Sequence, residues 1–134
     1  LMNELYAVIE MKGLNPYFGF LHRDKERHPT LASDLMEEWR AVIVDSMVMS
    51  LINGHEIQKT DFIINGDEPG CYLTRNGLKI FLNKLNNKLQ TKTRYLSYVD
   101  YPVSFRQGIA QQIDTLVNAV KTEDDLAYKP IEIR

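Results

Sequence analysis

Apolar residues recur at three- and four-residue steps in four stretches of the chain, separated by segments rich in Gly, Asn, Pro and charged residues. This spacing places the apolar side chains on one face of an α-helix, as in helices that pack against a core. The pattern predicts helices over residues 3–12, 30–52, 75–89 and 102–120.

The ends of these helices follow from residues that start or stop helices. Thr30 or Ser33 is expected to cap the second helix, and Asn53-Gly54 to end it. Thr74 is expected to cap the third helix. Pro102 suits the first position of the fourth helix, where a backbone N–H is not needed.

The apolar stripes also predict which side chains form the core. Between the helices, residues 60–65 are expected to be a short strand or an extended link, and the polar tail 122–134 to be loosely held. The fold class is therefore a compact all-α multi-helix domain with at most one short strand. The expected inward residues are Leu35, Trp39, Val42, Ile43, Met47 and Leu51 of the second helix, Leu78, Phe81, Leu82, Leu85 and Leu89 of the third, and Ile109, Ile113, Leu116 and Val120 of the fourth.

Length and composition limit the class of protein. The chain has 134 residues, 44% hydrophobic and 25% charged, which suits one globular domain. Apolar runs are interrupted by charges before the roughly 18 residues of a membrane span, so no membrane association is expected. The single Cys71 and the lack of a signal-peptide pattern favour a cytoplasmic location. The helical pattern begins at the first residues without a cap, and we expect a longer protein around this segment.

Charge is distributed unevenly along the chain. The net charge is −2, which argues against binding nucleic acid through bulk positive charge. Residues 30–68 carry eight acidic residues against two basic ones, whereas residues 69–99 carry six basic residues and no acidic ones. This arrangement suits an anionic polymer held beside a metal site, and it also suits an ordinary basic, solvated helix face.

One cluster could carry chemistry. Asp34, Glu37 and Glu38 are spaced so that their carboxylates share a helix face, and a divalent cation would relieve their repulsion. The apolar segment 17–21 could anchor His22 in the core and hold its imidazole over that helix. One imidazole with carboxylates suits Mg²⁺ or Mn²⁺ better than zinc. The alternative is an amphipathic helix whose dipole favours acidic residues in its first turns, preceded by a solvated loop.

Other polar residues have two interpretations. Arg40 could meet a phosphate oxygen beside a metal, or it could pair with Glu37 one turn back. A cluster of tyrosines could stack on bases, although packing between the third and fourth helices is favoured. His28 and His55 are expected on the surface. The tyrosines are Tyr95, Tyr98 and Tyr101.

Four segments together form a specific signature. They are GLNPYFGFLH, PTLASDLMEEWR, YLTRNGLKIFL and YKPIEIR, and they span nearly the whole chain. In this order the sequence resembles the C-terminal helical domain of the CRISPR-associated endonuclease of the adaptation step, the spacer integrase Cas one. The resemblance implies that residues 1–134 are the α-helical catalytic domain of a two-domain protein with a β-rich N-terminal domain.

The resemblance also assigns residues. It implies that His22 and Glu37 are metal ligands, and that Asp34 supports the histidine or is a further ligand. A third ligand, a glutamate, is expected upstream of this chain, so the segment alone is expected to be inactive. Ala41 departs from the family pattern, in which proline often follows the arginine.

The implied reaction is metal-dependent insertion of spacer DNA into a CRISPR array, by attack of a 3′-hydroxyl on a phosphodiester. The implied cofactor is Mg²⁺ or Mn²⁺. The implied partners are double-stranded DNA, a second copy forming a homodimer of the full-length protein, and a small ferredoxin-like adaptation protein. A non-catalytic helical DNA-binding or scaffold module remains the alternative. The residues expected to contact DNA backbone are Arg40, Lys79, Lys84 and Lys88.

Overall fold

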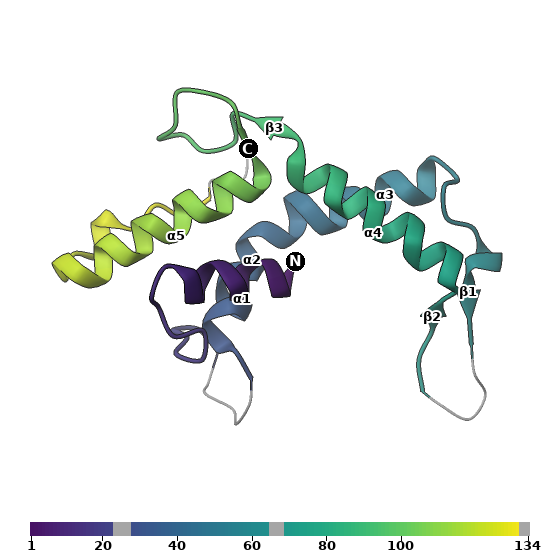
Figure 1. Cartoon of the computed structure of the whole chain (residues 1–134), viewed down its shortest axis with the longest axis horizontal. Helices are drawn as coiled ribbons and strands as arrows, with labels where there is room; N and C mark the ends of the chain where they lie inside the picture. The colour runs from purple at the N-terminus through teal and green to yellow at the C-terminus, as the bar shows by residue number, and fades with distance from the viewer. Residues whose placement is uncertain (23–27, 65–68, 132–134) are drawn as a thin grey trace.

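A computed structural model describes residues 1–22, 28–64 and 69–131 of the chain. The predicted helical fold is confirmed, because the described residues are built mainly from four helical segments (Figure 1). No helix among these residues has both the length and the apolar character needed to cross a bilayer. The helical elements are α1 (Met2–Met11), α2 (Thr30–Trp39), η1 (Arg40–Asp45), α3 (Ser46–Asn53), η2 (Lys59–Asp61), α4 (Arg75–Gln90), α5 (Phe105–Thr122) and η3 (Asp125–Ala127).

The expectation of at most one short strand is wrong. Four strands of two residues each form two antiparallel pairs, which join consecutive helices rather than build a layer. The strand predicted within residues 60–65 is present, and its partner comes from a segment whose short apolar run gave no separate signal. The pairs are β1 (Phe62–Ile63) with β2 (Tyr72–Leu73), and β3 (Lys92–Thr93) with β4 (Val103–Ser104).

The second predicted helix is one continuous helical run that changes its winding. It passes from α2 into a π-helical segment, η1, and then into α3. The predicted caps are wrong, because Thr30 and Ser33 lie inside the helix and Pro29 precedes it. The Thr30 hydroxyl instead donates to the Tyr17 carbonyl at 2.6 Å, so this side chain ties the preceding loop to the helix.

The fourth predicted helix starts three residues later than expected. Ser104 is its N-cap, accepting from the Gln107 backbone N–H, and the Gln107 side chain accepts from the Ser104 N–H in return. This reciprocal pair satisfies two N–H groups at the helix start. Pro102 therefore precedes β4 and is not the first helical residue.

The main core lies where α1, α2 and α5 meet. Trp39 is fully buried at its centre, with the ring of Phe105 edge-on at a centroid distance of 6.2 Å. Tyr95 packs against both rings, which confirms the packing interpretation for this tyrosine. Burial of these large aromatic side chains contributes to the apolar area that stabilises the fold. The other buried members are Leu5, Val8, Ile9, Leu31, Ala32, Leu35, Ile43, Leu89, Leu96, Ile109, Ile113 and Leu116.

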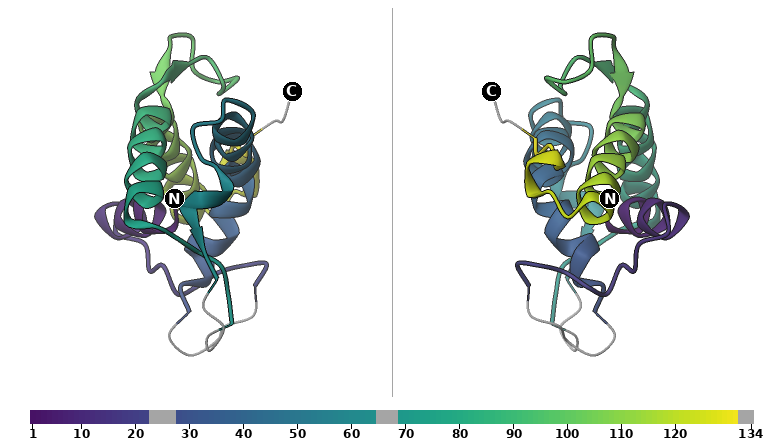
Figure 2. Two further views of the ribbon diagram at one scale, coloured as in Figure 1. Left: turned by 90° about the vertical axis from the view of Figure 1, so that its right-hand side faces the viewer. Right: turned by 90° about the vertical axis from the view of Figure 1, so that its left-hand side faces the viewer.

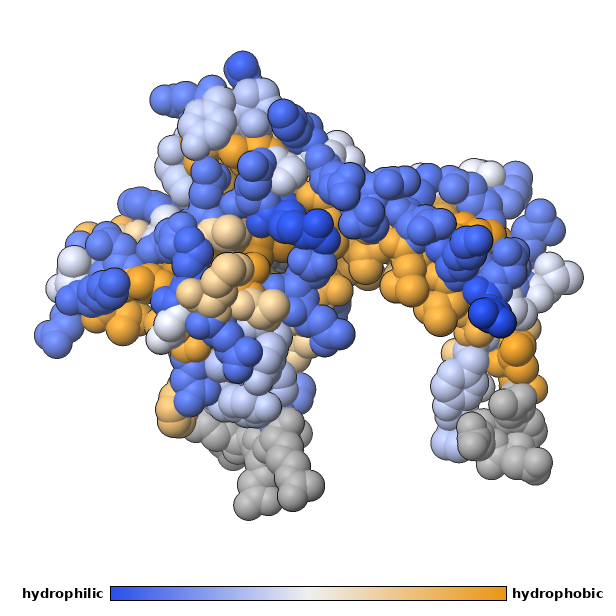
Figure 3. All heavy atoms as spheres, in the orientation of Figure 1, coloured by the Kyte–Doolittle hydropathy of each residue, from blue (hydrophilic) through white to orange (hydrophobic). Residues whose placement is uncertain are grey.

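A smaller apolar cluster lies in an arm formed by α3, α4 and the β1–β2 pair (Figure 1). Met47, Leu51 and Ile57 are its buried residues. The expectation that the whole α4 stripe points inward is wrong, because Leu78 and Leu82 are 46% and 52% exposed. They extend past the end of the main core, and Figure 3 shows hydrophobic atoms along the lower side of the arm and hydrophilic ones above. Val120 of α5 is likewise exposed.

The long connections point to one side. In Figures 1 and 2 the segment between α1 and α2 and the β1–β2 pair both project downward from the helices. Residues 94–102 project to the opposite side. The loop that ends at His22 therefore lies at one edge of the helical body, beside the start of α2.

Candidate functional site

Asp34 fixes the loop that precedes α2. Its carboxylate is buried, at 2% exposure for the residue, and it accepts hydrogen bonds from three consecutive backbone N–H groups. The Phe20 and Leu21 N–H groups donate to Oδ2 at 2.6 and 2.9 Å, and the His22 N–H donates to Oδ1 at 3.1 Å. A carboxylate is well suited to this task because it only accepts hydrogen bonds and can accept several.

The His22 ring completes the set of donors to Asp34. Its Nδ1 lies 2.5 Å from Asp34 Oδ1. Because an ionised carboxylate can only accept, we assign the proton to Nδ1, which leaves the Nε2 lone pair of the neutral ring free. The side chain is 47% exposed, so the ring is oriented by the protein while remaining accessible to solvent. This is the arrangement by which proteins orient a metal-binding histidine.

The charge on Asp34 is retained although the group is buried. Burial by itself would raise the pKa of this carboxyl, but hydrogen bonds from the Leu21 N–H, the His22 ring and the Phe20 and His22 N–H groups outweigh it. The net effect lowers the pKa below its usual 3.8. Both oxygens already accept two hydrogen bonds, so Asp34 has little capacity left for a cation.

Gly19 allows the loop to approach α2 closely. Its N–H donates to the Thr30 hydroxyl at 2.9 Å. A Cβ at this position would lie 2.6 Å from Asp34 Oδ2 and 2.8 Å from Thr30 Cβ, closer than side chains tolerate. The spacing of apolar and charged residues does not single out Gly19, although a glycine between two aromatic residues could have indicated a close backbone approach.

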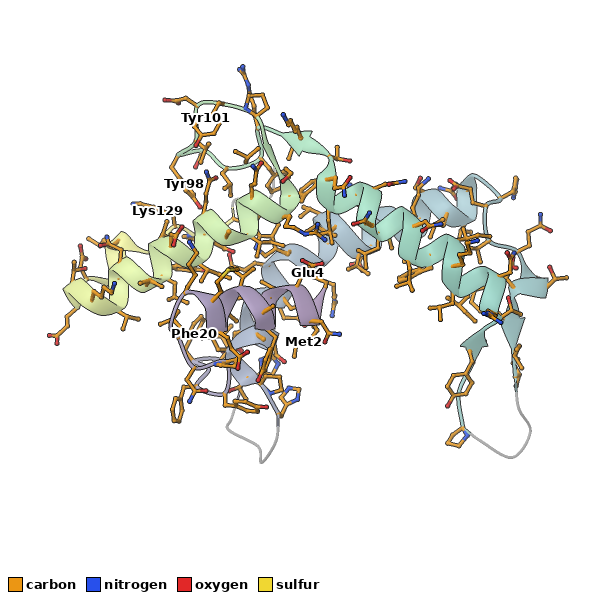
Figure 4. The ribbon with its side chains drawn as sticks, viewed as in Figure 1. Met2, Glu4, Phe20, Tyr98, Tyr101 and Lys129 are labelled. Atoms are coloured by element: carbon orange, nitrogen blue, oxygen red, sulfur yellow. The ribbon has the colours of Figure 1, made fainter. Side chains whose placement is uncertain are left out.

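Residues 18–21 are therefore anchored by hydrogen bonds, whereas the Tyr17 ring packs edge-on against Tyr6. The expectation that segment 17–21 sits in the core is wrong, because Phe18, Phe20 and Leu21 are 69%, 57% and 73% exposed. Figure 4 shows Phe20 in the loop beside α1. The backbone N–H groups face α2, and this turns the apolar side chains of the same residues outward.

The three carboxylates at the start of the second helix do not form a cluster. Asp34 faces the loop, Glu37 is exposed with Arg40 Nη1 3.4 Å from its Oε1, and Glu38 turns toward the C-terminal segment. The expected mutual repulsion on one face is thus absent. Helical spacing places the three residues on the same side of the helix. Each carboxylate is bound by different hydrogen-bond donors, and these donors turn the three side chains in different directions. The Glu37–Arg40 contact corresponds to the ion-pair interpretation of Arg40.

Glu38 holds the C-terminal segment against the helix. It accepts from the Gln112 side-chain amide at 2.7 Å, from the Ile131 N–H at 2.9 Å and from the Tyr128 hydroxyl. The side-chain oxygen of Gln112 accepts a hydrogen bond from Trp39 Nε1 at 2.6 Å. The expectation of a loosely held tail is therefore wrong up to residue 131. Burial, followed by the bond to Glu38, raises the pKa of Tyr128 well above its usual value.

The sequence contained one signal for this network. Gln112 falls within the apolar stripe of α5, between Ile109 and Leu116, and it is completely buried. A polar side chain at a core position requires partners. That requirement predicts a buried polar contact, but it does not identify Glu38 or Tyr128.

The predicted DNA-contacting lysines lie along α4 but differ in their surroundings. Lys79 is exposed, and Lys84 forms an ion pair with Glu56. The Lys88 ammonium lies 5.0 Å from the centre of the Phe105 ring, and burial lowers the pKa of this amine. Arg40 is on η1, at the end of α2. Lys84 and Lys88 therefore lie one turn apart on the helix beside α3, whereas Arg40 lies between the carboxylates of Glu37 and Asp45.

The remaining candidates are on the surface. His28 and His55 are exposed, as expected, with His28 Nε2 2.9 Å from the Ser33 hydroxyl. Tyr101 is 60% exposed on the loop between β3 and β4, whereas Tyr98 is only 36% exposed (Figure 4). Burial raises the pKa of Tyr98 to about 12, with smaller effects from Glu38 and Asp114.

The donor types fit a hard divalent cation, but the set is incomplete. His22 Nε2 and the Glu37 carboxylate are available ligands of the kinds that Mg²⁺ and Mn²⁺ accept. Within residues 1–22, 28–64 and 69–131, no three His, Cys, Asp or Glu side chains are grouped as a metal site. A complete site of this kind therefore needs at least one ligand in addition to the described residues.

Comparisons with known proteins agree on one family. The sequence profile described as CRISPR associated protein Cas1 matches residues 1–87. The CRISPR-associated endonuclease Cas1 of Mycobacterium tuberculosis strain CDC 1551 is 32% identical over 121 residues, which is 90% of this chain. The aligned region is 36% of that relative, so the chain spans about a third of its length.

Solved structures match over nearly the whole chain. A casposase bound to integration product superposes with a TM-score of 0.82 at 28% identity, covering 99% of this chain and 38% of the casposase. A Cas6-RT-Cas1–Cas2 complex contains a chain with a TM-score of 0.81 at 23% identity, covering all of this chain and 14% of that one, which shows the fold alone. With the profile matching well over half of its residues, the chain belongs to the family of CRISPR associated protein Cas1.

Proposed function

We propose that this chain is the catalytic helical domain of a metal-dependent DNA endonuclease and integrase of CRISPR adaptation. The observation that carries the proposal is the His22 imidazole, which is held at Nδ1 by the buried Asp34 and whose Nε2 has no partner among the residues that the structure describes. Asp34 is fully occupied by loop hydrogen bonds, so its role is to position the histidine and it is not a ligand. Among the described residues, His22 and Glu37 are the metal ligands of this proposal.

A bound Mg²⁺ or Mn²⁺ would supply Lewis acidity at the scissile phosphodiester. His22 would offer Nε2 in a fixed direction, because rotation of the ring breaks its bond to Asp34. Glu37 would offer a carboxylate oxygen, for which it exchanges its long contact with Arg40. The Arg40 Nη1 that contacts Glu37 could then donate to a phosphate oxygen of the DNA backbone, while Arg40 Nε lies 4.0 Å from Asp45 Oδ2.

The reaction in the longer protein is a transesterification. The 3′-hydroxyl of the incoming DNA loses its proton as its oxygen bonds to phosphorus, the existing P–O bond breaks, and the leaving 3′-oxygen takes up a proton. Number and type of bonds are conserved, so positioning and charge stabilisation supply the catalysis. A further carboxylate ligand, a second copy of the protein and a small adaptation partner belong to this proposal. The likeness to a casposase bound to its integration product supports DNA as the substrate.

Calorimetric titration of the longer protein with Mn²⁺ tests the two ligands assigned in this chain. His22→Ala and Glu37→Ala should each abolish the saturable heat of binding, whereas Glu38→Gln should retain it, because Glu38 faces the C-terminal segment. In the longer protein the same two alanine variants should fail to join a labelled DNA end to a repeat-containing duplex. Integration at the wild-type rate in either variant would refute the assignment.

The non-catalytic DNA-binding module is the competing function. The absence of a complete ligand group among the described residues is the observation in its favour. It predicts that DNA binding by the chain is insensitive to EDTA and that the longer protein joins no DNA ends in Mn²⁺. The second measurement separates the two functions.

A further inference from the structure

A polar groove lies where α3 packs beside α4, away from His22 and Glu37. Its volume is about 260 Å³, and the side chain of Met47, almost fully buried, contributes apolar surface to its lining. Side chains from both helices form its polar lining, so the spacing of two packed helices sets its width. The polar residues are Ser46 and Ser50 from α3, Lys84, Asn87 and Lys88 from α4, and Thr91, which ends that helix.

The groove contains more positive charge than its neighbours neutralise. Lys84 is paired with Glu56. Lys88, four residues further along α4, has no carboxylate partner among the residues that the structure describes, and it rests over the Phe105 ring. Burial opposes the charged form of this amine and lowers its pKa. An anion in the groove would repay that cost by supplying the missing counter-charge.

Two uncharged donors remain available beside the ammonium groups. In the described part of the chain, neither the Ser50 hydroxyl nor the Asn87 side-chain amide has a protein hydrogen-bond partner. The hydroxyls of Ser46 and Thr91 differ, since they donate to the Val42 and Asn87 carbonyls at 2.7 and 3.0 Å. The free donors and the two lysines come from facing helices, so a bound group would receive hydrogen bonds from more than one direction.

This donor set favours a phosphodiester over a flat carboxylate. A tetrahedral phosphate presents oxygens in several directions and is bound well by lysine acting as a point charge. Figure 3 shows one side of the arm as hydrophilic. Lys79, on the same helix as Lys84 and Lys88, is exposed. Repeated phosphates of a DNA strand could follow the hydrophilic side, whereas the lower side of the arm is apolar.

We propose that the groove between α3 and α4 binds one backbone phosphate of duplex DNA, with Lys88, Asn87 and Ser50 as its main contacts. The inference rests on the proposed function insofar as DNA is the substrate, and it adds an anchoring point outside the metal-binding residues. The contact positions the duplex and does not read its sequence, because every nucleotide presents the same phosphate.

Fluorescence anisotropy of a labelled duplex with the 134-residue chain in EDTA tests the groove. Lys88→Ala should weaken binding roughly tenfold and reduce the slope of log K against log salt by about one. Lys121→Ala removes an exposed charge at the far end of α5 and serves as the matched control, with little effect on either quantity. Equal effects of the two substitutions would mean that only bulk charge matters, and the proposal would fail.

A second pair of variants keeps every lysine in place. Ser50→Glu puts a carboxylate into the groove, and Asn118→Glu adds the same charge to an exposed position on α5. Ser50→Glu should abolish the contribution of the groove to DNA affinity. Asn118→Glu should only repel the DNA weakly, and salt should screen that repulsion. Thermal unfolding by circular dichroism checks that both variants are folded. Equal DNA affinities for the two would also overturn the proposal.

NMR with inorganic phosphate at constant ionic strength separates the phosphate itself from the polymer. Shifts of the Ser50 and Asn87 side-chain or backbone signals are expected at millimolar phosphate, and the Asn87 shift should be absent in Ser50→Glu. Shifts scattered over all lysine-bearing surfaces would contradict a defined site. Because these measurements need no metal, loss of Mn²⁺ binding in His22→Ala would leave them unchanged, so the groove and the metal site can fail separately.

Discussion

His22 Nδ1 lies 2.5 Å from Asp34 Oδ1, and the same carboxylate also accepts the backbone N–H of His22 at 3.1 Å. One buried side chain thus fixes both the position of residue 22 in the chain and the rotation of its ring. Loss of Asp34 should therefore change two properties together, the stability of the fold and the affinity for a divalent cation.

Asp34→Ala leaves three backbone N–H groups and the His22 ring without their acceptor. We expect the free energy of unfolding to fall by about 3 kcal/mol, since hydrogen bonds to a charged group are stronger than neutral ones and these donors are only partly solvated. Mn²⁺ affinity should fall about 10- to 100-fold, the effect typical of losing the partner of a histidine ligand. Urea unfolding and calorimetry measure the two effects. His22→Ala, as the control, should abolish Mn²⁺ binding with a much smaller loss of stability, because Asp34 keeps its three backbone donors.

Gly19→Ala introduces a methyl group where Asp34 Oδ2 would be 2.6 Å away. The loop must then move off α2, and we expect a loss of about 1–3 kcal/mol, the range for overpacking a tight contact. The movement lengthens the bonds from Phe20 and Leu21, so backbone amide exchange in this loop should accelerate. Gly13→Ala is a useful comparison, because no atom lies within 4 Å of its added Cβ, and its cost comes only from a φ of +80°. Unchanged exchange at Phe20 and Leu21 in Gly19→Ala would argue against the close approach.

The helical framework could be predicted from sequence because it depends on local, periodic information. Trp39, Ile43 and Leu51 repeat at helical steps, and their burial follows from that spacing. The π-helical segment between Arg40 and Asp45 leaves no such mark, since it changes the winding without interrupting the apolar pattern. The stripe of α4 predicted burial for Leu82, yet a stripe says nothing about whether another element reaches it.

The site was predictable in its residues and not in its geometry. Spacing and the family resemblance drew attention to His22, Asp34 and Glu37, but spacing also suggested that the carboxylates repel each other on one face. Three backbone N–H groups instead hold the Asp34 carboxylate against the loop. Every residue except proline has such a donor, so the sequence does not show which of them will bind Asp34. The partners of Glu38 lie up to 93 residues away, so only the folded chain identifies them.

Glu37 and Glu38 are adjacent in sequence and should differ sharply when replaced. Glu38→Ala removes the acceptor of Gln112, Tyr128 and the Ile131 N–H, and we expect a loss of about 2–4 kcal/mol. Glu37→Ala at an exposed position should stay within about 0.5 kcal/mol of wild type. Chemical denaturation compares the two, and limited proteolysis should release the C-terminal segment only from Glu38→Ala. Similar stabilities would show that Glu38 does not hold this segment.

Tyr128 should make the fold sensitive to alkaline pH. Its pKa is raised in the native state by burial and by its bond to Glu38, whereas in the unfolded chain it has the usual value of 10.0. Above pH 10 the unfolded state therefore binds fewer protons than the native state, and the free energy of unfolding falls as pH rises. Tyr6 and Tyr98, whose pKa values are raised to about 12, act in the same direction.

The contribution of Tyr128 is isolated by comparing how steeply the free energy of unfolding changes with pH in wild type and in Tyr128→Phe. The absolute stabilities of the two proteins differ for other reasons. Tyr128→Phe loses the hydrogen bond to Glu38 at every pH, so it should be less stable than wild type at neutral pH. Between pH 10 and 11.5 its stability should decline less steeply, by up to about 1.4 kcal/mol per pH unit, the value for one proton. The lysines titrate in both proteins and cancel in the difference. Parallel declines in urea unfolding would mean that the Tyr128 hydroxyl titrates normally, and that the contact between Glu38 and the C-terminal segment is open in solution.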